Sequence, residues 1–275
     1  MERANVNGVE LEYEVRGSGE PVLLIHGALI AAAMAPLLAE QALPDRDQLI
    51  RYHRRGVGGS THTPAPVRVA DQAADAAGLL ADLGIDRAHV AGHSYGGAIA
   101  LQLAVDTPGA VQSLALMEPG LLTVPSGEAF FARLGPCLAA YGAGDREEAT
   151  LGFLSIVAGL DREAVRTVVE ATVPGGIEQA IKDADMFFSI ELGALGEWAF
   201  GPDQAAAISQ PVLSALGAES ETVFVDGRPL LHSWFAKTED FTLDGAGHLL
   251  QMQRPQAMAK GLADFFARHP LPADA

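Results

Sequence analysis

Residues 90–100, VAGHSYGGAIA, contain the pentapeptide GHSYG, which places Ser94 between Gly92 and Gly96. A strand-like apolar run precedes the pentapeptide, and a helix-like run follows it. A nucleophile held on so tight a strand-to-helix turn crowds its neighbours, so glycine is needed at the flanking positions. The turn lifts the serine hydroxyl clear of the backbone, and the N-terminus of the helix favours developing negative charge. The stretch therefore predicts that Ser94 is a nucleophile rather than an ordinary serine of a glycine-rich loop.

Strand-like and helix-like segments alternate on both sides of this motif. Continuous apolar runs such as PVLLIHG are typical of buried parallel strands, and the alternation predicts a doubly wound, mostly parallel α/β sheet that is covered on both faces. In such sheets the reacting groups gather beyond the carboxyl ends of the strands. The predicted strands are 9–15, 21–27, 48–53, 88–94, 113–119, 210–217 and 240–247, and the predicted core helices are 30–42, 69–83, 97–107 and one that starts near residue 255.

The alternation stops between residues 120 and 205, which have a helical pattern throughout. One helical face is formed by Ile177, Ile181, Ala184 and Phe188, and Asp161 is a suitable N-cap for an earlier helix. We therefore predict a core domain made of residues 1–119 and 206–275, with residues 120–205 inserted as a helical cap, or lid.

A serine nucleophile needs a base, and His248 is the best candidate. It lies in LDGAGHLLQ, in a glycine-flexed loop after a late strand, and it follows the nucleophile in chain order. We expect His26 to hydrogen-bond loop backbone near the site, and the side chain of His93 to point away from the serine into the sheet. Surface or packing roles are expected for the other histidines, namely His53, His62, His89, His232 and His269.

Four segments, VLLIHG, RRGVGGS, GHSYGG and GAGHLLQ, occur in the order in which the α/β-hydrolase superfamily has them. The chain resembles the helical-cap members of that superfamily over residues 1–119 and 206–270. The resemblance implies the fold and serine-dependent hydrolysis, but no particular substrate. It also implies that the backbone amides of Tyr95 and Ala28 form the oxyanion hole, the pair of donors that stabilises the negative oxygen formed during acyl transfer.

The acid that should orient the histidine is not at its usual position. In most of the family it is an aspartate three residues after the glycine that ends the penultimate strand, and here that position is Ser220, flanked by Glu219 and Glu221. Some relatives, including zearalenone-type lactone hydrolases and certain haloalkane dehalogenases, place their acid after the strand that follows the nucleophile helix, where this chain has Glu118. We favour Glu118. Glu219, Glu221 and the absence of any acid stay open as alternatives.

A serine nucleophile favours attack on carbonyl carbon. It argues against dehalogenase and epoxide hydrolase chemistry, which in this fold uses aspartate. Aromatic side chains in the cap suggest an apolar, partly enclosed pocket: Phe130, Phe131, Tyr141, Phe187, Phe188, Trp198 and Phe200. We therefore predict a serine hydrolase that cleaves a carboxylic ester or lactone of a moderately hydrophobic small molecule through an acyl-enzyme. The alternatives are a hydrolase of a carbon–carbon bond in a diketone and a non-catalytic small-molecule-binding protein.

Composition limits the partners that we expect. The net charge of −17 disfavours nucleic acid and anionic lipid. The single cysteine allows no intrachain disulfide, and the chain shows neither a signal-like N-terminus nor an apolar run of about 20 residues, so we expect a cytoplasmic protein with no membrane partner. We predict a small-molecule substrate, no cofactor and no metal, and a homodimer stays open. RRGVGGS lacks the lysine and the spacing of a nucleotide loop, and Arg54-Arg55 within it is assigned no function.

Overall fold

The computed structural model describes residues 1–63 and 65–272, so the last three residues of the predicted core segment lie outside it. One eight-stranded sheet has the spatial order β1-β2-β4-β3-β5-β6-β7-β8. β2 pairs antiparallel with β1 and with β4, and every other pairing in this sheet is parallel. The strands are β1 (Glu2–Val6), β2 (Val9–Arg16), β3 (Glu20–Ile25), β4 (Asp47–Tyr52), β5 (Ala88–His93), β6 (Val111–Met117), β7 (Val212–Gly217) and β8 (Thr238–Leu243).

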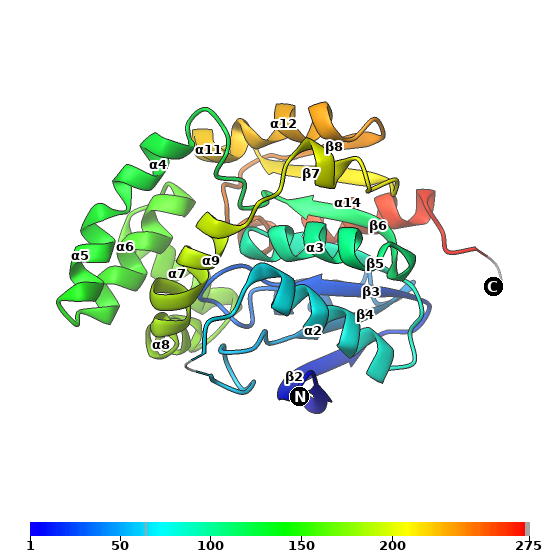
Figure 1. The fold of residues 1–275 in the computed structure, drawn as a ribbon, viewed down its shortest axis with the longest axis horizontal. Helices are drawn as coiled ribbons and strands as arrows, with labels where there is room; N and C mark the ends of the chain where they lie inside the picture. Colours follow the sequence, from blue (N-terminus) through cyan, green and yellow to red (C-terminus); the bar gives the residue numbers. More distant parts are fainter. Residues whose placement is uncertain (64, 273–275) are drawn as a thin grey trace.

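Helices cover both faces of the sheet, as the apolar runs predicted. Alternate residues of β3 belong to different cores: Leu23 and Ile25 lie in one buried cluster, while Val22 and Leu24 lie in another. The first cluster includes α2 (Val69–Asp82) and α3 (Tyr95–Asp106), which lie across one face in Figure 1. The second includes α1 (Ala35–Ala39) and α14 (Pro255–Arg268). The remaining core helices are η1 (Pro108–Ala110), α11 (Thr222–Val225), α12 (Gly227–Trp234) and α13 (Leu250–Gln253).

The cap consists of the helices between β6 and β7, and Figure 1 shows α4 to α8 gathered at one end of the sheet. The predicted N-cap is confirmed, since the Asp161 side chain accepts a hydrogen bond from the amide of Ala164 at 2.8 Å. The cap elements are α4 (Gly127–Arg133), α5 (Gly135–Gly142), α6 (Arg146–Ala158), α7 (Arg162–Thr172), α8 (Gly176–Lys182), the π-helical η2 (Met186–Glu191), α9 (Leu192–Glu197) and α10 (Pro202–Ala205). No helix in the described part of the chain is both long and apolar enough to cross a bilayer.

The predicted helix 30–42 was too long. The predicted face of Ile177, Ile181, Ala184 and Phe188 does pack on one side, but the helix that carries it is not regular throughout. The expected helix 30–42 is reduced to α1. Before α1 the backbone at Leu29 is left-handed (φ 66°), and the amide of Ala31 donates to Gln179 of the cap. The helical face through Phe188 is interrupted after α8. There the Asp183 carboxylate accepts from the amide of Gly58 in the core, and the chain continues as a π-helix.

The carboxyl ends of β5, β6 and β7 lie side by side, which brings the candidate residues together. The amide of Ser94 donates to the carbonyl of Met117 at 3.0 Å, and the amide of Glu118 donates to the carbonyl of Ala215 at 3.1 Å. Ser94 and Glu118 are therefore the first residues beyond two adjacent parallel strands.

We predict that Gly96→Ala destabilises the protein strongly. A Cβ at position 96 would lie 2.3 Å from the carbonyl oxygen of Ile25 in β3, and backbone at the centre of a sheet cannot move aside. Overpacking typically lowers the free energy of unfolding by about 1–3 kcal/mol, and the rigid backbone places this substitution at the upper end. Urea unfolding monitored by circular dichroism measures the change. Gly193→Ala is the matched control, because a Cβ there meets no atom within 4 Å and alanine favours the helix. Equal unfolding midpoints for the two variants would refute the steric argument.

Candidate active site

The backbone at Ser94 is strained, with φ 53° and ψ −118°, which few non-glycine residues adopt. Close packing on both sides enforces this conformation. A Cβ at Gly92 would lie 2.4 Å from the carbonyl oxygen of Gly96, so the two glycines allow the chain to reverse within a few residues. Within the described residues the Ser94 hydroxyl makes no hydrogen bond, and it is presented at the edge of the sheet.

The backbone amides of Tyr95 and Ala28 have no hydrogen-bond partner among the described residues. Tyr95 is the first residue of α3, where amides lack an intrahelical acceptor. Both residues line the same cavity as Ser94. These are the donors that the family resemblance implied, and their free N–H groups fit an oxyanion hole.

His248 and Glu118 form a buried pair. Nδ1 of His248 lies 2.7 Å from Oε2 of Glu118, and the side chains are 3% and 0% exposed. The other oxygen of Glu118 accepts hydrogen bonds from the amide of Gly217, at 2.7 Å, and from the hydroxyl of Ser220. The carboxylate thus has three donors, and Nδ1–H as the donor on His248 leaves Nε2 of that ring free to accept a proton.

The alternative acids do not contact His248. Glu219 is exposed, and both oxygens of Glu221 bind Arg133 of α4, the shorter contact being 2.6 Å. Ser220, which occupies the usual position of the acid, instead donates to Glu118. The structure therefore brings Glu118, and neither Glu219 nor Glu221, to the histidine.

Two small cavities flank Ser94. One, of about 20 Å³, is bordered by both Ser94 and His248, and the other, of about 50 Å³, extends from Ser94 beneath the cap. The larger one is lined by uncharged side chains from the core, α4, α6, η2, α9 and α11, among them Leu121, Phe130, Phe153, Phe187, Leu195 and Phe224. Both are much smaller than the roughly 300 Å³ at the lower end of small-molecule sites, so the described conformation is closed around the serine.

A profile of the alpha/beta hydrolase fold matches residues 20–255 of the 275. The chain belongs to the alpha/beta hydrolase fold family. The strand order and the placement of Ser94, Glu118 and His248 at the strand ends agree with this membership.

Individual relatives of this alpha/beta hydrolase have diverse names. The RutD protein of Azorhizobium caulinodans, named for carbamate hydrolysis, is 36% identical over 119 residues, which are 43% of this chain and 44% of that protein. A soluble epoxide hydrolase of Corynebacterium is 31% identical over 134 residues, covering 46% and 44% of the two chains. The chain thus spans less than half the length of these curated relatives. The crystal structure of the enol-lactonase from Burkholderia xenovorans LB400 superposes with a TM-score of 0.78 over 97% of this chain and all of that one, at 23% identity, which shows a common fold.

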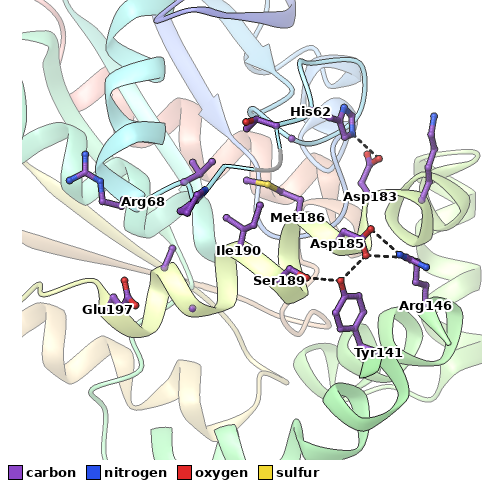
Figure 2. A pocket seen from close by; sticks show the side chains of 17 residues that line it. His62, Arg68, Tyr141, Arg146, Asp183, Asp185, Met186, Ser189, Ile190 and Glu197 are labelled. Atoms are coloured by element: carbon purple, nitrogen blue, oxygen red, sulfur yellow. Dashed lines mark hydrogen bonds and ion pairs between the residues drawn. The ribbon is translucent and has the colours of Figure 1, made fainter. Parts of the chain in front are cut away.

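A separate groove of about 750 Å³ in this alpha/beta hydrolase is lined by neither Ser94 nor His248. Figure 2 shows that several of its polar side chains pair with one another: His62 with Asp183, and Asp185 with both Arg146 and Tyr141. Met186 and Ile190 border it, so η2 separates this groove from the apolar cavity, which Phe187 lines. In residues 1–63 and 65–272 no group of three or more His, Cys, Asp or Glu is arranged to hold a metal ion.

His93 lies against the loop of His248, so the expectation that its side chain points away into the sheet was wrong. Its Nε2–H donates to the carbonyl of His248 at 2.8 Å, and its Nδ1 accepts from Gln251. Burial, and after it the neighbouring His248, lowers the pKa of His93 to about 3. His93 therefore stays neutral and holds the backbone of the loop, while the ring of His248 stacks on Phe224 with centroids 3.8 Å apart.

We predict that His93 makes the protein less stable as the pH falls below about 6.5. The unfolded chain takes up a proton on His93 near pH 6.5, whereas the folded protein does so only near pH 3. The contribution of neutral His93 to the free energy of unfolding is therefore complete above pH 6.5. Between pH 6.5 and pH 3 this contribution falls by about 1.4 kcal/mol per pH unit. Urea unfolding of wild type and His93→Gln at pH 6.5, 5.5 and 4.5 tests this, because the variant lacks the titrating group. Identical slopes for the two proteins would contradict the prediction.

Proposed function

We propose that the protein is a serine hydrolase that cleaves a carboxylic ester or lactone of a small apolar molecule through an acyl-enzyme. The observation that carries the proposal is the meeting of four features at one sheet edge. They are a strained serine, two unpaired amides beside it, a histidine across a small cavity, and a carboxylate 2.7 Å from the far nitrogen of that histidine. The names of the RutD protein and of the enol-lactonase also refer to substrates with a carbonyl carbon.

In the proposed mechanism Nε2 of His248 takes the proton of the Ser94 hydroxyl as its oxygen attacks the carbonyl carbon. The negative oxygen of the tetrahedral intermediate is held by the amides of Tyr95 and Ala28. The intermediate collapses to an acyl-serine as His248 returns the proton to the leaving alcohol. His248 then deprotonates a water molecule, which attacks the acyl group and restores Ser94. Glu118 keeps Nε2 as the accepting nitrogen and stabilises the cation.

The lining of the cavity selects the substrate class. Among the described residues, no charged one borders the 50 Å³ cavity, and His93 and His248 are the only titratable groups that border the other. A carboxylate on the substrate would be buried there without a partner, which costs several kcal/mol. The substrate is therefore uncharged on the acyl side, and the net charge of −17 further disfavours anions.

Because the cavity is closed around Ser94, part of the cap must move to let the substrate enter. Phe131 of α4 lines the apolar cavity and is 41% exposed, so the cavity comes closest to solvent along α4. Phe224 of α11 lines the same cavity, and the Ser126 hydroxyl donates to Asp226 at 2.6 Å, which ties α4 to the segment after α11. We place the entrance between α4 and α11.

A panel of neutral and anionic substrates tests the function. We expect turnover of p-nitrophenyl esters and lactones with neutral acyl chains. Matched esters with a terminal carboxylate should have kcat/KM lower by about 100-fold, because that charge would be desolvated. A fluorophosphonate should label Ser94 stoichiometrically, and Ser94→Ala should lose both labelling and turnover. Cleavage of diketones alone would favour the carbon–carbon hydrolase, and tight binding of an ester without turnover or labelling would favour a binding protein.

Replacing the proposed acid should reduce kcat while leaving the fold intact. In Glu118→Gln the amide oxygen can still accept from Gly217 and Ser220, but the amide nitrogen then faces Nδ1 of His248 and favours the wrong tautomer. We expect kcat to fall by about 10³–10⁴-fold. Glu219→Gln and Glu221→Gln are the matched controls and should stay within about 3-fold of wild type, because surface changes away from the site have small effects. Near-full activity of Glu118→Gln would show that Glu118 is not the acid.

A further inference from the structure

Arg54 is a fully buried cation, 1% exposed, although the sequence suggested an ordinary turn arginine. Its Nη1 donates to the carboxylate of Glu191 and to the side-chain oxygen of Gln72, and Glu191 is 0% exposed. Burial disfavours the charge of Arg54, but the adjacent carboxylate of Glu191 outweighs that effect and the pKa of Arg54 is raised. The guanidinium is therefore a permanent charge in the interior.

The guanidinium of Arg54 hydrogen-bonds to the peptide group between Gly27 and Ala28. Nη2 of Arg54 donates to the carbonyl of Gly27 at 2.9 Å, and Nδ1 of His26 lies 2.7 Å from the same oxygen. Nε2 of His26 accepts from the amide of Arg54 at 3.0 Å, so the proton of the neutral ring is on Nδ1, which donates. Burial, followed by the charge of Arg54, keeps the pKa of His26 well below its usual value.

The carbonyl of Gly27 and the amide of Ala28 belong to one planar peptide group. Two donors on the oxygen fix the plane of that group. They also polarise it, because hydrogen bonds in series strengthen one another at low dielectric. The N–H of Ala28 is thereby aimed and made a stronger donor. The guanidinium of Arg54 also lies 4.9 Å from the ring centroid of Tyr95, whose amide is the other proposed donor.

The geometry points to Arg54 as a positioning residue for the oxyanion hole, held in place by Glu191 of the cap. This inference rests on the proposed function. Glu191 ends the π-helical η2, and that irregular turn brings its carboxylate to Arg54. Met186 and Ile190, from the same turn, border the outer groove in Figure 2. One buried ion pair therefore links the cap to the peptide that would bind the oxyanion.

The decisive variant is Arg54→Lys, which keeps the charge. A single ammonium cannot reproduce the planar fork that contacts Gly27, Gln72 and Glu191 together. We expect kcat for the best ester to fall by about 10–100-fold, which is less than the loss caused by removing an oxyanion donor altogether. KM should stay within about 3-fold of the wild-type value. A trifluoromethyl ketone forms an oxyanion on the serine, so its inhibition constant should rise by the same factor. The corresponding alcohol should bind as it does to wild type.

Glu191→Gln provides a second variant, which retains a hydrogen-bond acceptor but removes the compensating charge. Glu191→Gln should also lower kcat and weaken inhibition by the trifluoromethyl ketone while KM stays nearly unchanged, but the fall in kcat should be smaller than in Arg54→Lys. The matched control is Arg55→Lys, since Arg55 binds Asp75 at 2.5 Å and 2.6 Å and has no contact with the Gly27 peptide. Its kcat and its affinity for the trifluoromethyl ketone should stay within about 2-fold of wild type, in line with an arginine remote from the site. All rates are expressed per active site titrated with fluorophosphonate, which removes the contribution of misfolded protein.

The outcomes separate the two claims. If wild type neither turns over esters nor reacts with the fluorophosphonate, the proposed function fails. If wild type is active and Arg54→Lys lowers thermal stability while kcat and inhibitor affinity stay within 2-fold, the role of Arg54 is structural only and the positioning inference is overturned.

Discussion

The rest of the site depends on one steric constraint, the reversal of the chain between β5 and α3. The backbone at Gly96 lies so close to β3 that a Cβ would approach the carbonyl of Ile25 to 2.3 Å, and the chain makes this turn with Ser94 at φ 53°. Three consequences follow together. The serine is raised from the sheet edge, the first amide of α3 lacks an acceptor, and the helix N-terminus points at the space where negative charge would form.

The geometry of the sheet explains why the carboxylate that contacts His248 can come from either of two neighbouring strands. Because β5, β6 and β7 are adjacent and parallel, Glu118 after β6 and position 220 after β7 both face the loop of His248. Glu118 has an αL-like backbone (φ 47°), a strained conformation that the surrounding packing must hold. Ser220, at the position where the family resemblance placed the acid, instead donates its hydroxyl to Glu118.

The sequence predicted those parts of the fold that short patterns determine. Apolar runs located the parallel strands, and glycine spacing located the turn at Ser94. β1, with only two buried residues, and the short helices α11 (4 residues) and α12 (8 residues) were not predicted. The pairing of Glu118 with His248 spans 130 residues, so the sequence could only rank candidates. Arg54 was missed because burial of a charge depends on a partner 137 residues away, and no local signal distinguishes it from its neighbour Arg55, which is half-buried beside Asp75.

A buried ion pair between cap and core needs a reason beyond stability. Apolar residues of equal volume are often as stable or more so, because removing two charges from water costs as much as their attraction returns. Separating the two charges is unfavourable, however, because each would then lie in the interior without its partner. A buried charge without its partner destabilises a protein by about 3–5 kcal/mol. The Arg54–Glu191 pair therefore makes one arrangement of η2 relative to the core strongly preferred. That arrangement is also the one in which the Gly27 carbonyl has both of its donors and the apolar cavity is closed around Ser94. In the proposed mechanism, the ion pair that holds η2 against the core also holds the Ala28 amide, so displacing η2 would disturb both the closed cavity and the alignment of that amide.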